Sequence, residues 1–231
     1  MRARFALLLV GFSILVLLFW GLGVLTEHAF PPESNGVDGS LTLSASEVVA
    51  NNRTLRGVLR VVTELGGGAV TITLAVGVGV LWSWKRPRWD AARLLALSIG
   101  GSTAAKTFVK GLVSRPRPPV ARLIEATGSS FPSGHAVRGV ALFGALAVLA
   151  GAMGWSRRTR VIVWLAASAL VVVIASSRVL LGVHYPADVT AGVALGIAWL
   201  ALVVASESGA RIDTLDVSAS GPGVETARIE S

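Results

Sequence analysis

Six long apolar runs recur along the chain, and they constrain its fold more than any other feature. They cover residues 5–25, 66–84, 91–109, 136–154, 160–176 and 188–205 approximately. Each run is about long enough to cross a hydrocarbon core of ~30 Å as an α-helix. Only 15% of the residues are charged, whereas a soluble domain of this length carries about 25%. The sequence therefore predicts an all-α membrane bundle of about six transmembrane helices.

Six spans leave no room for a second folded domain in 231 residues, so we expect one membrane-embedded domain over residues 1–205. Residues 26–45 are polar and contain Pro31 and Pro32, which predicts an exposed loop. Residues 46–65 alternate apolar and arginine positions at helical spacing, which predicts a helix in the membrane interface before the second span. Residues 206–231 are polar, and we expect them to form a disordered cytoplasmic tail.

The charged residues between the spans predict the orientation. Arg2 and Arg4 precede the first span, which fits either a secretory signal peptide or a retained anchor, and the length of the run favours the anchor. The positive-inside rule then places the N-terminus, residues 85–93 and residues 157–160 in the cytoplasm. Residues 110–135 and 177–187 fall outside. We expect a multi-pass protein of the cell membrane.

Composition excludes several classes of function. The net charge is +8, but the basic residues do not form one stripe, so the sequence does not favour a nucleic-acid partner. The absence of cysteine excludes a disulfide framework, a thiol nucleophile and a thiolate metal site. Gly192 and Gly196 form a small-xxx-small pair in the last span, which predicts a close helix contact.

Three polar segments at the ends of apolar runs contain the residues that could perform chemistry. The first runs from Lys110 through Arg115 to Arg117 and Pro118. Arginine offers a planar fork that matches two phosphate oxygens, and lysine supplies a compact charge. The alternative is a basic cluster that contacts lipid headgroups, and we expect such a role, or a supporting one, for Arg115 and Arg122.

The second segment is Phe131-Pro132-Ser133-Gly134-His135, directly before the fourth span. Ser133 is placed as an N-cap, and a helix N-terminus with free N–H groups binds anions. Gly134 allows close approach of the backbone, and His135 can donate or accept a proton. The alternative is an ordinary helix cap with a histidine at the membrane interface.

The third segment joins the fifth and sixth spans and contains Ser177, Arg178, His184 and Asp188. Asp188 could fix the tautomer of His184 and leave its other ring nitrogen free to attack. The alternatives are an aspartate that merely favours a helix N-terminus and a metal site. A metal site is disfavoured because the only histidine besides His135 and His184 is His28, in a distant segment.

These three segments, in this order, resemble the type 2 phosphatidic acid phosphatase superfamily, which includes membrane lipid phosphatases and the soluble vanadium haloperoxidases. The shared signature is K-x6-RP, then PSGH, then SR-x5-H-x3-D. Every defining position is matched between Lys110 and Asp188. The membrane composition of this chain favours the lipid phosphatase branch.

The resemblance implies roles for individual residues. His184 would attack phosphorus to form a phosphohistidine, Asp188 would orient it, and His135 would protonate the leaving oxygen and then activate water. The phosphoryl oxygens would be bound by five residues: Lys110, Arg117, Arg178, Ser133 and Gly134. Three fixed cations can stabilise the charge of the transferring phosphoryl group, so neither a metal nor another cofactor is expected.

The expected partners are the lipid bilayer and a membrane lipid phosphate. Phosphatidic acid, phosphatidylglycerophosphate and a polyprenyl diphosphate all fit a site at the outer leaflet, and the sequence does not discriminate among them. A phosphotransferase that passes the phosphoryl group to another acceptor, or a non-catalytic lipid transporter, would use the same bundle. The sequence predicts no oligomeric state.

Overall fold

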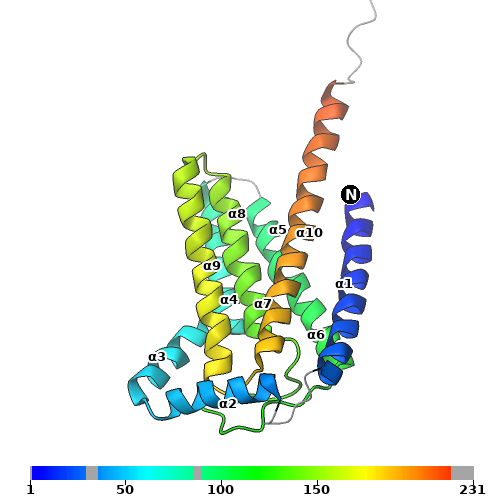
Figure 1. Ribbon diagram of the computed structural model, residues 1–231. Coiled ribbons are helices and arrows are strands. Elements are labelled where there is room, and N and C mark those ends of the chain that lie inside the picture. The colour runs from blue at the N-terminus through cyan, green and yellow to red at the C-terminus, as the bar shows by residue number, and fades with distance from the viewer. Residues whose placement is uncertain (1, 30–35, 86–89, 220–231) are drawn as a thin grey trace, which may run out of the picture.

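The computed structural model describes residues 2–29, 36–85 and 90–219, and it is helical throughout its regular elements (Figure 1). This confirms the predicted all-α class. In chain order the elements are α1 Arg2–Ala29, α2 Val37–Ala50, α3 Arg53–Glu64, α4 Gly68–Lys85, α5 Asp90–Ala96, η1 Leu97–Gly101, α6 Ser102–Leu112, α7 Gly134–Gly139, η2 Val140–Gly144, α8 Ala145–Gly151, α9 Arg157–Leu180 and α10 Pro186–Ala219.

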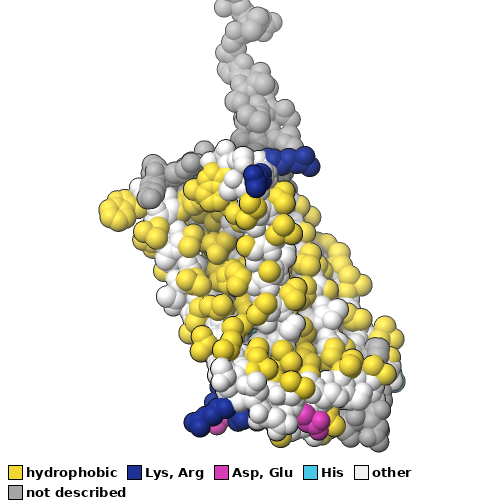
Figure 2. Space-filling model, turned by 60° about the vertical axis from the view of Figure 1, so that its left-hand side comes forward, with side chains coloured by type: hydrophobic (Ala, Val, Ile, Leu, Met, Phe, Trp, Pro, Cys, Tyr) yellow, Lys and Arg dark blue, Asp and Glu magenta, His cyan; other side chains and the backbone are white. Residues whose placement is uncertain are grey.

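The bundle carries the surface of a membrane protein. Four helical runs among the described residues are long and apolar enough to cross a bilayer: Arg4–Ala29, Gly134–Gly151, Arg157–Leu180 and Pro186–Glu207. A fifth results if α3 and α4, bent by 49° relative to each other, form one span. Hydrophobic side chains cover the middle of the molecule, and basic side chains gather at its two ends (Figure 2). The predicted count of six spans stays a prediction.

Two of the helical runs contain a π-helical turn, and the two turns lie against each other. In the run from α5 to α6, Trp199 of α10 donates a hydrogen bond from its indole N–H to the carbonyl of Leu97, at 2.9 Å. A Cβ on Gly101 would collide with the ring of Trp199. The π-helical turn and the glycine therefore let a tryptophan from the last helix enter the wall of the bundle.

The segment before the second span differs from the prediction. Of the predicted loop 26–45, residues 26–29 belong to α1 and residues 37–45 form most of helix α2, in which Asp38 and Thr42 are buried. The predicted interfacial helix over 46–65 is interrupted at Asn51 and Asn52, where the Asn52 side chain caps α3 by accepting from the N–H of Leu55. Residues 30–35 of the predicted loop lie outside the described residues. Buried polar contacts, which the residue pattern does not reveal, hold α2 against the bundle.

The last helix also extends further than predicted. α10 continues past residue 205 as far as Ala219, so the predicted disordered tail begins as helix, and residues 220–231 lie outside the described part of the chain. Within the bundle, α10 packs against α1 and α7. Gly192 and Gly196 make this packing close: a Cβ on Gly192 would lie 2.7 Å from the carbonyl oxygen of Ser133, and one on Gly196 would lie 2.7 Å from Val140 Cβ. The predicted close helix contact is confirmed.

The three polar segments meet at one end of the bundle, which we call the site end. It is formed by α2, the loop 113–133 and the turn 181–185 (Figure 1). The N-terminus of α1 and the far end of α10 lie at the opposite end. The segments predicted to lie outside and inside the cell are thus separated to opposite ends of the bundle.

Candidate active site

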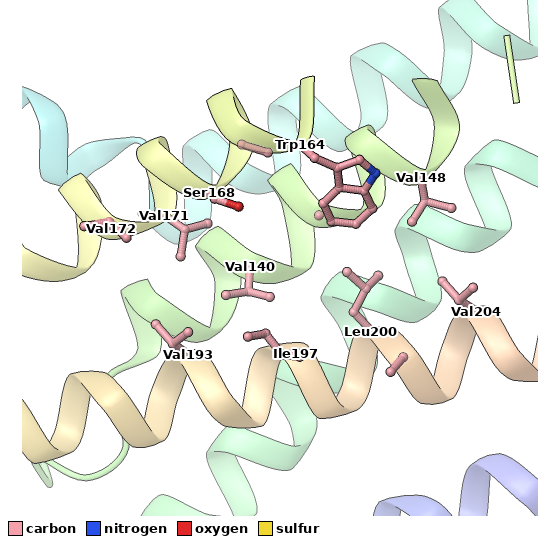
Figure 3. Close-up of a pocket in the computed structure, with 13 residues that line it drawn as sticks. Val140, Val148, Trp164, Ser168, Val171, Val172, Val193, Ile197, Leu200 and Val204 are labelled. Atoms are coloured by element: carbon pink, nitrogen blue, oxygen red, sulfur yellow. The ribbon is translucent and has the colours of Figure 1, made fainter. Parts of the chain in front are cut away.

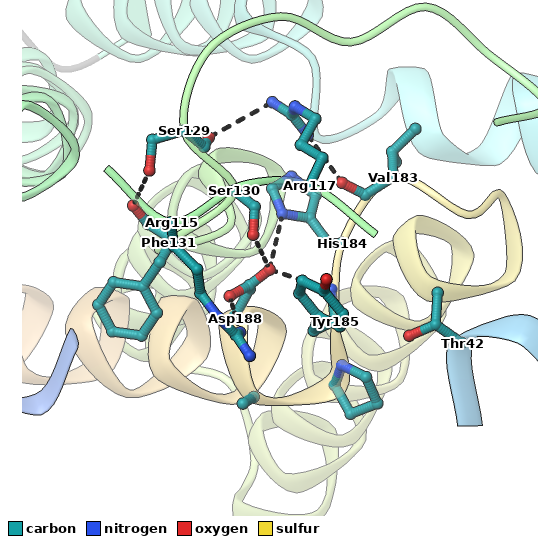
Figure 4. Close-up of polar contacts among 12 residues, drawn as sticks. Thr42, Arg115, Arg117, Ser129, Ser130, Phe131, Val183, His184, Tyr185 and Asp188 are labelled. Carbon is teal, nitrogen blue, oxygen red and sulfur yellow. Dashed lines mark hydrogen bonds and ion pairs between the residues drawn. The ribbon is translucent and has the colours of Figure 1, made fainter. Parts of the chain in front are cut away.

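His184 and Asp188 form the centre of the site end (Figure 4). His184 follows α9 in a tight turn, in which Gly182 has a φ of +71° and the N–H groups of Val183 and His184 both donate to the carbonyl of Arg178. Asp188 lies in the first turn of α10. His184 Nδ1 is 3.5 Å from Asp188 Oδ2, and both side chains are buried. Because Nδ1 faces the carboxylate, Nε2 is the ring nitrogen available to a reactant.

The carboxylate of Asp188 is held from several sides. Its Oδ2 accepts hydrogen bonds from the hydroxyl of Ser130 at 2.5 Å and from the N–H of Tyr185 at 3.0 Å. Its Oδ1 is 2.5 Å from Nη1 of Arg115. These contacts come from the loop 113–133 and from the turn before α10. The position of the carboxylate is therefore fixed independently of His184.

Arg115 has a different place from the one expected. The sequence suggested a headgroup or supporting role, whereas the side chain is fully buried and pairs with two carboxylates, Asp188 and Asp38 of α2, the latter at 2.9 Å. Its guanidinium also lies 4.2 Å from the centre of the Tyr185 ring. Asp38 in turn accepts from the N–H of Ala187 at 3.1 Å. No spacing in the sequence links residue 38 to residues 115 and 188, so sequence reasoning missed this network.

The three cations expected at the site surround the same centre. Lys110, at the end of α6, donates to the carbonyl of Ser129. Arg117 donates to the carbonyls of Val183 and Thr127, both at 2.7 Å, and thereby ties its loop to the turn that carries His184. Arg178, buried near the end of α9, donates from Nη1 to the hydroxyl of Thr63 at 2.9 Å. Arg122 instead donates to Ala126 within its own loop.

Residues 132–135, which we call the PSGH segment, lead into helix α7 beside these three cations. Ser133 occupies the N-cap position of α7, as expected, but its side chain makes no capping bond. Its backbone N–H donates to the carbonyl of Asp188 at 2.9 Å, which fixes the segment to α10. Gly134 is the first residue of α7, and His135 follows, within electrostatic range of both His184 and Arg178.

Ser133 Oγ and Arg178 Nε are buried at this centre and have no hydrogen-bond partner among the described residues. Buried polar groups are normally satisfied, and an orphaned one is often part of a ligand site. The hydroxyl of Ser133 and the guanidinium of Arg178 can both donate to an oxyanion. A centre with these donors, cations and a buried histidine can bind an anion.

The electrostatics of the turn favour a neutral histidine. Burial lowers the pKa of His184 to about 4, although the hydrogen bond and charge of Asp188 oppose this shift. Burial also raises the pKa of Tyr185 to about 12. Burial and the charge of Arg122 lower the pKa of Arg117, with Asp188 opposing. With this pKa the imidazole of His184 is unprotonated at neutral pH.

No group of three or more histidine, cysteine, aspartate or glutamate side chains placed to hold a metal ion occurs among the residues described here. His28, the remaining histidine, lies in α1, where its Nδ1 is 2.8 Å from the carbonyl of Val24 in the same helix. The donors around His184 are nitrogen cations and hydroxyls. This donor set suits an anion.

An apolar groove runs along the helices on the membrane side of the site end (Figure 3). It has a volume of about 540 Å³ and is lined by side chains of α9, α10 and the run from α7 to α8. Val140, Val171 and Val193 line the part nearest the site, within two helical turns of His135, Arg178 and Asp188 in sequence. The helices that position the site residues therefore also carry an apolar surface toward the bilayer.

The chain is similar in sequence to proteins of one known family. Residues 91–211 match the family model of the PAP2 superfamily. The chain is 29% identical over 162 residues to phosphatidylglycerophosphatase B of Bacillus subtilis (strain 168), a match that covers 70% of this chain and 79% of that protein.

Two solved structures have the same fold. The crystal structure of the first transmembrane PAP2 type phosphatidylglycerolphosphate phosphatase from Bacillus subtilis superposes with a TM-score of 0.75 at 26% identity, and the match covers 84% of this chain and 94% of that one. The crystal structure of Aquifex aeolicus LpxE superposes with a TM-score of 0.58 at 22% identity, covering 74% and 97% of the two chains. With its matching family model, membrane bundle and phosphate-binding residue types, the chain belongs to the PAP2 superfamily, as a membrane lipid phosphatase.

Proposed function

We propose that this phosphatase removes the terminal phosphate of a membrane lipid through a phosphohistidine formed on His184. The observation that carries the proposal is the buried pair of His184 and Asp188, with Lys110, Arg117 and Arg178 around it, at the end of a membrane bundle. A neutral histidine beside cations that gather an anion is the arrangement that nucleophilic attack on phosphorus requires.

In the first step, Nε2 of His184 attacks the phosphorus and the bond from phosphorus to the lipid oxygen breaks. His135 supplies the proton that the leaving oxygen takes up. Asp188 stabilises the positive charge that develops on the imidazole through its contact with Nδ1. In the second step, His135 removes a proton from water, the water oxygen attacks phosphorus, and the phosphorus–nitrogen bond breaks to release inorganic phosphate.

The cations supply most of the stabilisation. A transferring phosphoryl group spreads its charge over three oxygens, and catalysis consists mainly of positioning and stabilising that charge. Lys110, Arg117 and Arg178 would bind those oxygens, with the hydroxyl of Ser133 and the N–H of Gly134 adding hydrogen bonds. The orphaned hydroxyl of Ser133 and Nε of Arg178 support this assignment. With these groups present, the reaction needs no metal ion.

The substrate we propose is an amphiphile with a phosphate monoester or diphosphate headgroup. The proximity of an apolar groove to the site supports a lipid chain on the membrane side. Two of the similar proteins are named for phosphatidylglycerophosphate, which makes this lipid the first to test, beside phosphatidic acid and a polyprenyl diphosphate. The distribution of basic segments favours a cytoplasmic membrane location with the site end outside.

The test is phosphate release by purified protein in detergent from a panel of these three lipids. His184→Ala should lower turnover roughly 10³-fold or more on every substrate, because it removes the attacking nitrogen. His28→Ala is the matched control, since this exposed histidine lies in α1 and its Nδ1 is 2.8 Å from the carbonyl of Val24 in the same helix. Trapping with ³²P-labelled substrate should give an acid-labile phosphoenzyme in the wild type and none in His184→Ala. Turnover near that of the wild type in the alanine variant would contradict the proposal.

A further inference from the structure

Two further cations lie beside the three that surround His184. Lys106 is one helical turn before Lys110 on α6, and Arg138 is one turn after Gly134 on α7. A Cβ placed on Gly134 would lie 3.1 Å from Cδ of Lys106 and 3.4 Å from Nη1 of Arg138. The two side chains therefore lie together against the face of Gly134 that a Cβ would occupy.

Lys106 and Arg138 are not neutralised by the protein. Within the described part of the chain, neither has a carboxylate oxygen within 4.0 Å, and the two repel each other. Arg138 donates from Nε to the carbonyl of Gly66 at 3.1 Å, which holds its guanidinium in place. Both side chains are partly buried. Unpaired charges of one sign at this depth are expensive, and such residues in a membrane protein are functional by default.

Their position relative to the catalytic centre is on the membrane side. α6 ends at the site end and α7 begins there, so Lys106 and Arg138 lie roughly 5–6 Å further along their helices toward the middle of the bilayer than Lys110 and Gly134. Arg138 lies within electrostatic range of Lys110, His135 and Arg178. With the terminal phosphate of a lipid at His184, a next group that lies toward α6 and α7 would therefore be beside these two cations.

Lys110, Arg117 and Arg178 already match the three oxygens of one phosphoryl group, so the second pair is in excess for a simple phosphate monoester. We propose that Lys106 and Arg138 form a second phosphate subsite, which binds a phosphate located between the scissile phosphate and the lipid portion of the substrate. The inference rests on the proposed function. A second phosphate subsite makes the preferred substrate a lipid with two phosphates. Such a lipid is either a diphosphate or a phosphomonoester joined to a phosphodiester through a short polyol.

The experiment compares lipids that differ in the second phosphate. Purified wild type, Lys106→Met and Arg138→Gln are assayed in the same mixed micelles with phosphatidylglycerophosphate against phosphatidic acid, and with a polyprenyl diphosphate against the corresponding monophosphate. In at least one pair, each variant should lower the ratio of kcat/KM for the two-phosphate lipid over the one-phosphate lipid roughly ten-fold, since a charge-assisted bond to phosphate is lost. A change in the first pair alone identifies the phosphodiester, and one in the second alone identifies the diphosphate.

The control is Arg158→Gln, an exposed arginine at the opposite end of the bundle, which should leave both ratios unchanged. Equal losses on one-phosphate and two-phosphate lipids in both pairs, or no loss, would overturn the subsite. Failure of the wild type to release phosphate from any of these lipids would instead overturn the proposed function.

A second measurement covers the case in which the variants do not fold. The wild type is inhibited with methylphosphonate, methylenediphosphonate and 1,3-propylenediphosphonate, which carry one phosphonate, two close ones and two spaced ones. At least one diphosphonate should inhibit with an inhibition constant roughly ten-fold or more below that of methylphosphonate. If neither does so, the second subsite does not exist.

Discussion

Nη1 of Arg115 lies 2.5 Å from Oδ1 of Asp188, and both side chains are fully buried. The same guanidinium contacts Asp38, from a helix 77 residues earlier in the chain. The carboxylate beside His184 is therefore connected through one arginine to α2, outside the three motif segments. This connection makes α2 a structural part of the candidate active site.

Arg115→Met should destabilise the protein strongly, because it leaves two buried carboxylates without a counter-charge. Removing one partner of a buried ion pair costs about 3–5 kcal/mol. Asp38→Asn keeps the acceptor for the N–H of Ala187 and should cost less, about 1–3 kcal/mol. Asp38→Asn should also lower kcat with little change in KM, because the substitution shifts Asp188 through Arg115. Denaturation in mixed detergent micelles and steady-state kinetics measure the two effects.

Asp90→Asn is the control for these variants, because Asp90 is partly exposed at the opposite end of the bundle and its pair with Arg93 is 3.8 Å long. It should be nearly neutral in both measurements. Loss of stability in Asp38→Asn no larger than in Asp90→Asn would show that the buried network is not coupled to the fold.

The low pKa of His184, about 4, predicts how stability depends on pH. An unfolded histidine has a pKa of about 6.5, so between pH 6.5 and 4 the unfolded chain binds a proton that the native protein does not. The free energy of unfolding should therefore fall as the pH falls through this window, by up to about 1.4 kcal/mol per pH unit from this residue. His184→Gln should show a shallower decline. Parallel curves for the two proteins at pH 7, 6 and 5 would contradict the burial of a neutral imidazole.

Gly192→Ala should displace the PSGH segment, which packs against Gly192 of α10. Its Cβ would lie 2.7 Å from the carbonyl oxygen of Ser133 and 3.0 Å from Cβ of Ala136, so backbone must move. Overpacking of this kind costs about 1–3 kcal/mol, and we expect kcat to fall roughly ten-fold because Ser133 and Gly134 shift. Gly77→Ala in α4 is the matched control, since nothing lies within 4 Å of its new Cβ. Equal activity of the two variants would mean that this contact does not position the segment.

Activity should persist in excess EDTA and should be inhibited by vanadate. Cations of the protein take the part that a metal ion plays in many other phosphoryl transfers, and vanadate mimics the phosphoryl group in its five-coordinate state. Phosphate release is measured before and after dialysis against the chelator. Loss of activity that added magnesium restores would contradict a site built from Lys110, Arg117 and Arg178 alone.

Much of this molecule could be predicted from its sequence because the deciding signals are local. A long apolar run must become a helix in a bilayer, where each backbone polar group needs an internal partner. The motif residues Ser133, His184 and Asp188 are close to elements whose ends the sequence marks with proline, glycine and serine. Gly192 and Gly196 predicted a close helix contact because a small-xxx-small pair lets two backbones approach. These features need no knowledge of which helices are neighbours.

The predictions failed where the partner lies far away in the chain. Residues 37–45 are polar enough to suggest a loop, yet they belong to α2, where Asp38 is satisfied by Arg115 and by the N–H of Ala187. Arg115 looked like a headgroup ligand because only the folded bundle shows that it is buried. The cations Lys106 and Arg138, unremarkable in the sequence, adjoin Gly134 only when α6 and α7 pack together.

The sequence by itself determined the helical membrane bundle and indicated the family, and it predicted which residues lie around His184, since each depends on local pattern and short spacing. The tertiary structure decided which nitrogen of His184 faces Asp188, which arginine pairs with that carboxylate, and that Lys106 and Arg138 have no carboxylate oxygen within 4.0 Å among the described residues. The physical reason is that a buried charge is defined by its neighbours, and in a helix bundle those neighbours come from helices distant in sequence.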